Sequence, residues 1–216
     1  MGRISHQVES VERVSKHTVV LTLERRNLEF VPGQCFNLGL SSLAINREYS
    51  SYSGAQDPYL EFLVREVEQG ELSPKLAHLK PGDRVEVDGG YGLFVLEPTQ
   101  IKKTKYVFIG TGTGIAPFHS FVRSYPELDY LIVHGTRESD EDYHRIHYNK
   151  NRYVHCVSQS SGGDVRGRVT DYLSEATLPP QGLFYLCGNR HMINDVFDLL
   201  VRRGISTSQI MTEVFF

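Results

Sequence analysis

The sequence of 216 residues lacks several features that mark secreted, membrane-spanning or nucleic-acid-binding proteins. Its cysteines, Cys35, Cys156 and Cys187, are odd in number and far apart, so a disulfide framework is not expected. No apolar run approaches the ~20 residues that span a bilayer, and the first residues lack the apolar stretch of a secretory signal. The net charge of −3 gives no electrostatic basis for binding nucleic acid or an anionic membrane. We therefore expect a cytoplasmic protein with neither kind of partner.

The first part of the chain has the rhythm of an antiparallel β-domain. Short β-prone segments at 18–23, 59–64 and 84–87 are separated by turns that contain proline and glycine. Such spacing is typical of a barrel or a sandwich. It predicts one domain over residues 1–99.

The second part alternates between strands and helices. Apolar, β-prone runs occur at 106–109, 130–133, 153–157 and 183–186, with helical spacing over 117–124 and 192–203. Repeated β-α alternation favours a parallel, doubly wound sheet. It predicts an α/β domain over residues 100–216.

A glycine-rich turn follows the first strand of this second domain. It reads Gly110-Thr111-Gly112-Thr113-Gly114-Ile115-Ala116-Pro117. The order strand, glycine-rich turn, helix gathers unpaired backbone N–H groups at one point, which favours a phosphate or pyrophosphate. Gly112 and Gly114 allow the backbone to approach an anion closely, and Pro117 suits the first helical turn. The turn therefore predicts a nucleotide site, although a tight turn that binds nothing is the alternative.

A second strand of this domain ends in Cys187-Gly188-Asn189. Because the carboxyl ends of parallel strands meet at one edge of a sheet, a thiol and a glycine are expected in the same crevice as the glycine-rich turn. The alternative for Cys187 is a buried structural cysteine.

The first domain carries its own candidate ligand site. Arg47, Tyr49 and Ser50 offer a cation for a phosphate, a ring for stacking and a hydroxyl for a ring nitrogen. Further on, Gly70 precedes Ser73 and Pro74, which we interpret as a helix N-cap followed by the first helical position. Two anion sites and an aromatic platform indicate a dinucleotide with a tricyclic ring.

These four motifs, in this order and spacing, resemble the ferredoxin–NADP reductase family over nearly the whole chain. The resemblance implies a six-stranded Greek-key β-barrel that binds FAD and a Rossmann-like domain that binds the nicotinamide dinucleotide. It implies that Tyr49 stacks on the flavin ring, that Ser50 hydrogen-bonds flavin N5, and that Arg47 holds the pyrophosphate. The other FAD contacts that it implies are Val64, Arg65, Gly70, Leu72, Ser73, Phe215 and Phe216. The pyridine-nucleotide contacts that it implies are Gly112, Thr113, Gly114, Pro117, Cys187, Gly188 and Asn189.

The sequence ends in Glu213-Val214-Phe215-Phe216, similar to the Glu-x-aromatic ending of plant-type members. The resemblance implies that Phe215 covers the second flavin face, that Glu213 relays protons with Ser50, and that Cys187 lies beside nicotinamide C4. The alternative is a C-terminal strand whose aromatic residues pack into the core.

Selectivity for NADP over NAD is the weakest part of the match. NADP-selective members have a serine followed by arginine after the third strand of this domain, whereas this chain has Ser158-Gln159-Ser160. Arg168 resembles a second arginine that some bacterial relatives use for the 2′-phosphate, and Arg137 is a further candidate. We expect NADP, with NAD as the alternative.

The resemblance implies an FAD enzyme that passes electrons between NADPH and a ferredoxin or flavodoxin by hydride transfer between nicotinamide C4 and flavin N5. The alternatives are an NADH-dependent reductase component of an oxygenase, a free-flavin reductase, and a non-catalytic electron-conducting subunit. The chain has too few cysteines for an iron–sulfur cluster with four cysteine ligands. His144 and His147 are interpreted as solvated, and no metal is expected. The oligomeric state is left open.

Overall fold

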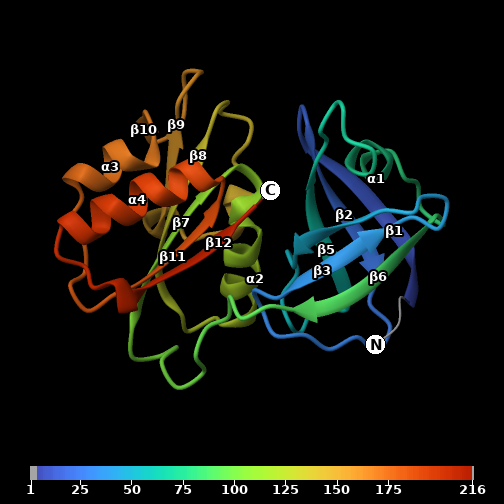
Figure 1. Ribbon diagram of the computed structural model, residues 1–216, viewed down its shortest axis with the longest axis horizontal. Helices are drawn as coiled ribbons and strands as arrows, with labels where there is room; N and C mark the ends of the chain where they lie inside the picture. The colour runs from blue at the N-terminus through green and yellow to red at the C-terminus, as the bar shows by residue number, and fades with distance from the viewer. Residues whose placement is uncertain (1–3, 216) are drawn as a thin grey trace. The chain divides into compact units, whose positions relative to one another are not determined.

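The computed structural model describes residues 4–215, which fold into two compact units (Figure 1). The first unit contains the chain up to Leu96 together with Ala116–Ser124, and the second contains Glu97–Ile115 and the chain from Tyr125 onward. The expected domain division at residue 99/100 stays a prediction. By its contacts, however, the helix that follows the glycine-rich turn groups with the first unit.

The first unit is a six-stranded antiparallel sheet. Its strands, in the order in which they lie side by side, are β4 (Asn46–Ser50), β3 (Cys35–Gly39), β6 (Arg84–Tyr91), β1 (Ile4–Ser15), β2 (Thr18–Glu24) and β5 (Tyr59–Arg65). A bridge between Ser51, which directly follows β4, and Phe62 in the middle of β5 links the two outer strands, so the sheet curls into a barrel. The expected Greek-key barrel is thereby confirmed.

Apolar side chains fill the barrel. Phe36 lies edge-on to both Phe30 and Phe62, with ring centroids 5.6 and 5.5 Å apart. The short helix α1 (Ser73–Ala77) buries Leu76 against this core. The longer helix α2 (Ala116–Ser124) presents Phe118 and Phe121 to Phe94.

The second unit is a six-stranded parallel sheet. Its strands, in spatial order, are β10 (Val165–Arg166), β9 (Tyr153–Val157), β8 (Asp129–Thr136), β7 (Lys105–Thr111), β11 (Leu183–Gly188) and β12 (Ile210–Val214). Helices α3 (Val169–Glu175) and α4 (Arg190–Arg202) lie side by side over one face, as Figure 1 shows. Four short 3-10 helices complete the unit: η1 (Gly112–Ile115), η2 (Arg145–His147), η3 (Lys150–Arg152) and η4 (Thr207–Gln209). The expected parallel α/β domain is confirmed.

The two faces of this sheet are buried by different side chains. Aliphatic residues such as Val107, Ile109 and Leu186 pack under α3 and α4. Aromatic residues occupy the alternate positions, where the ring centroids of Tyr106, Phe108 and Tyr185 lie within about 6 Å of one another. Among residues 4–215, no helix is long and apolar enough to cross a membrane.

Candidate active site

The glycine-rich turn and the Cys187-Gly188-Asn189 segment lie at the point where the order of the parallel strands reverses. From β7 the chain runs outward through β8, β9 and β10, and it then returns to the other side of β7 as β11. Cys187 pairs with Gly110 across β11 and β7. Open α/β sheets bind ligands at the carboxyl ends of the strands that flank such a switch point.

Close backbone packing explains why glycine is required on both sides of this point. A Cβ on Gly114 would lie 2.3 Å from the carbonyl oxygen of Cys187, which is too close for any other residue. Gly188 has φ +139°, and a Cβ there would lie 2.5 Å from Thr111 Oγ1. Asn189 closes the contact, because its Nδ2 donates to Thr111 Oγ1 (3.1 Å) while its Oδ1 caps helix α4. The glycine-rich turn and the end of β11 are therefore tightly packed against each other.

Cys187 and Glu213 lie side by side beneath this turn. The parallel register of β11 and β12 pairs the two residues, and the thiol donates to Glu213 Oε2 at 3.9 Å. Cys187 is fully buried, and this burial raises its thiol pKa well above the ordinary value, with the Glu213 charge acting in the same direction. The thiol therefore stays protonated and is a poor nucleophile.

Phe215, which directly follows β12, continues the pairing of that strand with β11. The backbone N–H of Phe215, a half-buried residue, donates to the carbonyl oxygen of Gly188 (2.8 Å). The predicted FAD contact Phe216 lies outside the described residues.

The candidates for a 2′-phosphate follow the outer strands. Arg137, after β8, and Arg168, at the start of α3, are both exposed. The carbonyl oxygen of Arg137 accepts the N–H groups of Gln159 and Ser160, which joins the loops after β8 and β9. Ser158 Oγ donates to the carbonyl oxygen of Thr136 (3.0 Å), so this bond would have to break before Ser158 could donate to a phosphate.

In the barrel, Arg47, Tyr49 and Ser50 lie together on strand β4. Because side chains alternate along a strand, Arg47 and Tyr49 share one face. Arg47 is exposed, and its Nη1 donates to the neighbouring Asn46 carbonyl. Tyr49 is half-buried, which raises its hydroxyl pKa to about 12 in spite of the nearby Arg47 charge, and Ser50 is buried.

The remaining predicted FAD contacts follow on β5 and the loop to α1. Val64 is buried and Arg65 half-buried at the end of β5. Gly70 packs tightly, since a Cβ there would lie 3.0 Å from the Val67 carbonyl oxygen and 3.1 Å from Ser73 Oγ. Leu72 is buried next to the start of α1.

The expectation that Ser73 is a helix N-cap is wrong. Leu72 is the N-cap of α1, and it makes no side-chain capping bond; Ser73 is the first helical residue. The Ser73 hydroxyl instead accepts the N–H of Val67 (3.1 Å) and so closes the loop between β5 and α1. Pro74 is therefore the second helical residue, not the first as expected, although it still lies in the first turn.

Helix α2 joins the barrel through polar contacts that the sequence did not indicate. Pro117 lies in its first turn, as expected. Further along, Ser120 Oγ donates to the carbonyl of Ser53 (2.7 Å) and accepts from Ser51 Oγ (3.1 Å). At its last turn, Arg123 forms a two-pronged ion pair with Asp57, with both N–O distances 2.8 Å. These contacts bind α2 to the segment that directly follows Ser50.

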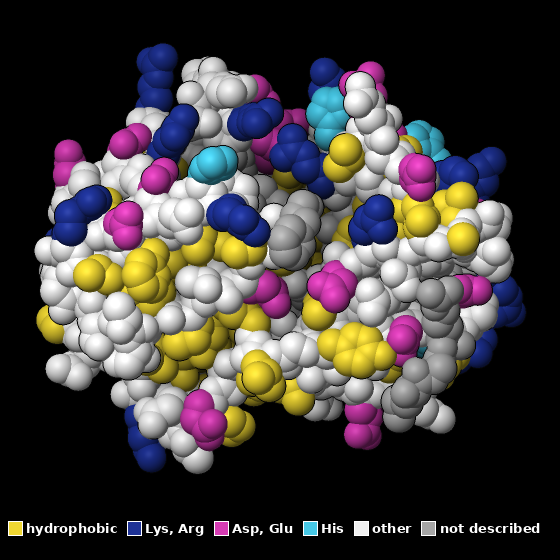
Figure 2. All heavy atoms as spheres, in the orientation of Figure 1, with side chains coloured by type: hydrophobic (Ala, Val, Ile, Leu, Met, Phe, Trp, Pro, Cys, Tyr) yellow, Lys and Arg dark blue, Asp and Glu magenta, His cyan; other side chains and the backbone are white. Residues whose placement is uncertain are grey.

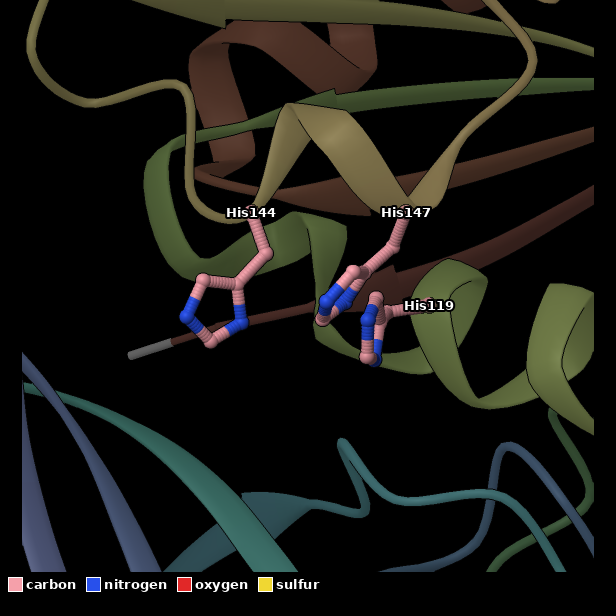
Figure 3. Close-up of side chains that lie close together, drawn as sticks. All are labelled: His119, His144 and His147. Atoms are coloured by element: carbon pink, nitrogen blue, oxygen red, sulfur yellow. The ribbon is translucent and has the colours of Figure 1, made fainter.

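His144 precedes the short helix η2 and His147 is its last residue; their ring centroids lie 4.8 Å apart (Figure 3). His144 is half-buried and adopts a left-handed backbone conformation, and His147 is exposed. His119, also drawn in Figure 3, belongs to α2 in the other unit, where its ring stacks on Tyr52 at a centroid distance of 3.7 Å.

Arg25 and Arg203 are held by backbone carbonyl groups. Arg25 donates to the carbonyl oxygens of Leu28, Ala55 and Asp57, and Arg203 donates to those of Leu173 and Ala176. On the face shown in Figure 2, Lys and Arg side chains are interspersed with Asp and Glu.

His134, which lies in strand β8 and forms a hydrogen bond to the glycine-rich turn, was not among the predicted site residues. Its Nε2 is 2.8 Å from the carbonyl oxygen of Gly112. The available signal was a histidine directly after the apolar predicted strand over 130–133.

Comparisons with known proteins define the class of this chain as a two-domain flavin and nicotinamide oxidoreductase. The family of oxidoreductase FAD-binding domains matches residues 5–96, and the family of oxidoreductase NAD-binding domains matches residues 108–198. The flavodoxin/ferredoxin–NADP reductase of Escherichia coli is 30% identical over 89% of this chain and 87% of that protein. The chain belongs to the ferredoxin–NADP reductase family and is an FAD- and NAD(P)-binding reductase.

The chain is also similar to an oxygenase component and to two reductases of known structure. The toluate 1,2-dioxygenase electron transfer component of Pseudomonas putida is 29% identical over 96% of this chain, which spans 66% of that protein. Among solved structures, a Neisseria gonorrhoeae ferredoxin NADP+ reductase with bound FAD and NADP has a TM-score of 0.89 at 22% identity, and the match covers both chains fully. An Amycolatopsis cytochrome P450 reductase also has a TM-score of 0.89, at 28% identity, over 99% of this chain and 69% of its own.

Proposed function

We propose that this reductase transfers electrons between NADPH and a one-electron carrier protein, a ferredoxin or a flavodoxin. The observation that carries the proposal is the packing of the glycine-rich turn on Cys187-Gly188, with the neutral Cys187 thiol and Glu213 directly alongside. The family relationship supports the same reading, because the Escherichia coli relative is named for these carriers.

The barrel residues fit an FAD. Arg47 offers an exposed guanidinium for the pyrophosphate, and Tyr49 offers a ring on the same strand face. The loop between β5 and α1 is a cradle that a Cβ at Gly70 would fill, with Ser73 as its hydroxyl. Val64, Arg65 and Leu72 complete this proposed contact set. Bound FAD supplies a group that accepts a hydride and gives up electrons singly.

The residues at the switch point then have distinct proposed roles. Gly112, Thr113 and Gly114 hold the pyrophosphate of the nucleotide through backbone N–H groups, followed by Pro117, while Gly188 and Asn189 shape the other side. Cys187 lies beside nicotinamide C4, and because its thiol is neutral it does not add to the ring. Glu213 and Ser50 hold and relay the proton that accompanies two-electron transfer, and Phe215 shields the flavin.

NADP selectivity is proposed to depend on Arg168 and Arg137, which are the exposed cations after β10 and β8. Replacing Arg168 by Ala should lower kcat/KM for NADPH about 10- to 100-fold and leave kcat/KM for NADH unchanged, because only NADPH carries the 2′-phosphate. Arg202→Ala, an exposed arginine at the end of α4, is the control. Equal values for NADPH before and after the Arg168 change would remove this residue from the site.

An NADH-dependent oxygenase reductase is the second candidate. Two observations favour it: the hydroxyl proton of Ser158 is already donated to Thr136, and glutamine follows Ser158 where arginine is expected for NADP. A wild-type kcat/KM higher for NADH than for NADPH would support this second candidate. Reduction of ferredoxin or flavodoxin by NADPH at a rate that matches turnover would support the first. The cytoplasmic location stays a prediction.

A further inference from the structure

His134 is a fully buried imidazole near the carboxyl end of the parallel strand β8. Burial disfavours the charged form and lowers its pKa to about 3. The ring is therefore neutral at physiological pH, with one nitrogen as donor and the other as acceptor.

The partners of His134 fix which nitrogen carries the proton. Nε2 lies 2.8 Å from the carbonyl oxygen of Gly112, which only accepts, so Nε2–H is the donor. Nδ1 lies 2.8 Å from the hydroxyl of Tyr153 on the adjacent strand β9, so that hydroxyl donates to Nδ1 rather than to the more distant Asp142 carbonyl oxygen at 3.3 Å. Both nitrogens are engaged, and the ring is locked in one orientation.

The packing around His134 brings it directly under the glycine-rich turn. The register of β7 and β8 pairs Gly110 with His134 and Thr111 with Gly135. A Cβ at Gly135 would lie 2.8 Å from Val169 Cγ1 and 3.1 Å from Thr111 Cγ2. The close packing at the carboxyl end of β8 therefore leaves little room for the glycine-rich turn to move.

The bond to Gly112 determines where the next backbone N–H points. In a trans peptide the C=O of one residue and the N–H of the next point in opposite directions. Gly112 has φ +54°, and its carbonyl is held toward the sheet by His134. The N–H of Thr113 therefore points away from the sheet, and it lies in the first turn of η1, where N–H groups have no partner within the helix.

We propose that His134 is a positioning residue for the pyridine dinucleotide. It holds the Gly112 carbonyl inward and so aims the Thr113 N–H at the pyrophosphate. This inference rests on the proposed function, in which the turn binds that pyrophosphate.

The test compares His134→Leu, which removes the donor, with His134→Gln, whose amide retains one. We expect His134→Leu to raise KM about 10-fold for both NADPH and NADH, because both share the pyrophosphate, with kcat within about twofold. FAD content should be unchanged, and His134→Gln should restore most of the affinity. Tyr106→Phe is the control: Tyr106 is equally buried in the same sheet, and its hydroxyl has no hydrogen-bond partner among the described residues.

Two results would overturn the inference while leaving the proposed function intact. One is an unchanged KM in His134→Leu. The other is a rise of KM in His134→Gln as large as that in His134→Leu, which would indicate that His134 acts through packing alone. Should the leucine variant not fold, Tyr153→Phe removes the hydrogen bond to Nδ1 that holds the ring in its orientation and should raise KM two- to threefold; no change would count against the inference. A wild-type protein that neither nucleotide reduces would overturn the proposed function and this inference together.

Discussion

The two units present their candidate ligand groups in different ways. In the barrel the groups are side chains on one strand, and the exposed Arg47 and half-buried Tyr49 stand out from β4. In the α/β unit they are mainly backbone N–H groups, held in place by contacts from below. His134 holds the Gly112 carbonyl, and the Cys187 backbone packs against Gly114.

The difference predicts where each unit is sensitive to substitution. A side chain that contacts a ligand can be truncated without disturbing the fold around it. A backbone segment packed against another backbone has no such freedom, because a single added Cβ displaces both. Changes at the barrel site should thus weaken FAD binding by degrees, whereas changes at the switch point should abolish binding of the pyridine nucleotide.

The largest effect is expected for Gly114→Ala. The new Cβ would lie 2.3 Å from the Cys187 carbonyl oxygen and 2.7 Å from its carbonyl carbon, so the turn must shift. We expect the rate of flavin reduction by NADPH to fall at least about 100-fold, with FAD content retained. Gly39→Ala in β3 is the control, since its nearest neighbour would be 3.3 Å away. A normal rate of flavin reduction in Gly114→Ala would contradict the claim that the α/β site is more sensitive to substitution than the barrel site.

The next effect concerns the ion pair between helix α2 and the barrel. Arg123→Met removes the two-pronged bond to Asp57, whose side chain is only 17% exposed. The Asp57 carboxylate then lacks the positive charge that offsets its loss of hydration. The free energy of unfolding should fall by about 2 kcal/mol, as measured by urea denaturation. Arg202→Met, which removes an exposed arginine at the end of α4, serves as the control and should change the free energy of unfolding by less than about 0.5 kcal/mol. Equal stability in the two variants would show that the pair contributes nothing.

A smaller effect is expected for Arg47→Ala. Loss of one charge-assisted phosphate contact should weaken FAD binding about 10-fold, because the barrel keeps its fold and its other contacts. The dissociation constant of FAD can be measured by recovery of flavin fluorescence on dilution. At saturating FAD, reduction by NADPH should be unchanged, the opposite of the Gly114→Ala result. Arg84→Ala, an exposed arginine on β6, is the control.

The pH dependence of barrel stability should reveal a half-buried acid, Glu61. Burial raises the pKa of Glu61 on β5 to about 7, opposed by the Arg123 charge and reinforced by Asp57 and Glu12. A raised acid pKa favours folding below the unfolded value, and the benefit is lost as pH rises through about 7. Between pH 5 and 8 the wild type should therefore lose about 1 kcal/mol that Glu61→Gln does not lose. Identical pH profiles for the two proteins would contradict this, and Glu9→Gln, which removes an exposed acid, is the control.

The smallest expected effect is a difference in reactivity among the three cysteine thiols. Cys35 in the barrel is half-buried, whereas Cys156 and Cys187 in the α/β unit are buried, and burial raises their pKa values, that of Cys156 to about 12. At pH 8 the native protein should react slowly with iodoacetamide at Cys35 alone, and all three cysteines should react after denaturation. Mass spectrometry of Cys35→Ser should then show no native labelling. Native labelling of Cys187 would show that its thiol is not held as described.

The fold was largely predictable, because its strongest signals are periodic. The strand over 153–157 was predicted with the bounds of β9, and the other predicted strands lie inside observed ones. Strand β1 was missed because its 12 residues are mostly polar, and two register shifts break the alternation that marks a strand. Helix α3 was missed because it is only seven residues long and buries just Val169 and Leu173.

The candidate site was predictable only where a local motif carried it. Glycine spacing identified the turn, and Cys187-Gly188-Asn189 identified its neighbour. The roles of His134 and Ser120 depend on contacts with residues 22 and 67 positions away, which no local pattern shows. The Ser73 cap was wrong for the same reason, since its hydroxyl is bonded to Val67 across the loop.

The most direct test of this account is an anaerobic titration of the purified, FAD-loaded protein with NADPH, followed by the flavin absorbance. The account predicts that the yellow colour is lost at about one equivalent of NADPH, because each nucleotide delivers one hydride. It predicts further that the colour returns when an oxidised ferredoxin or flavodoxin is added. A yellow protein that neither NADPH nor NADH bleaches would contradict the central claim.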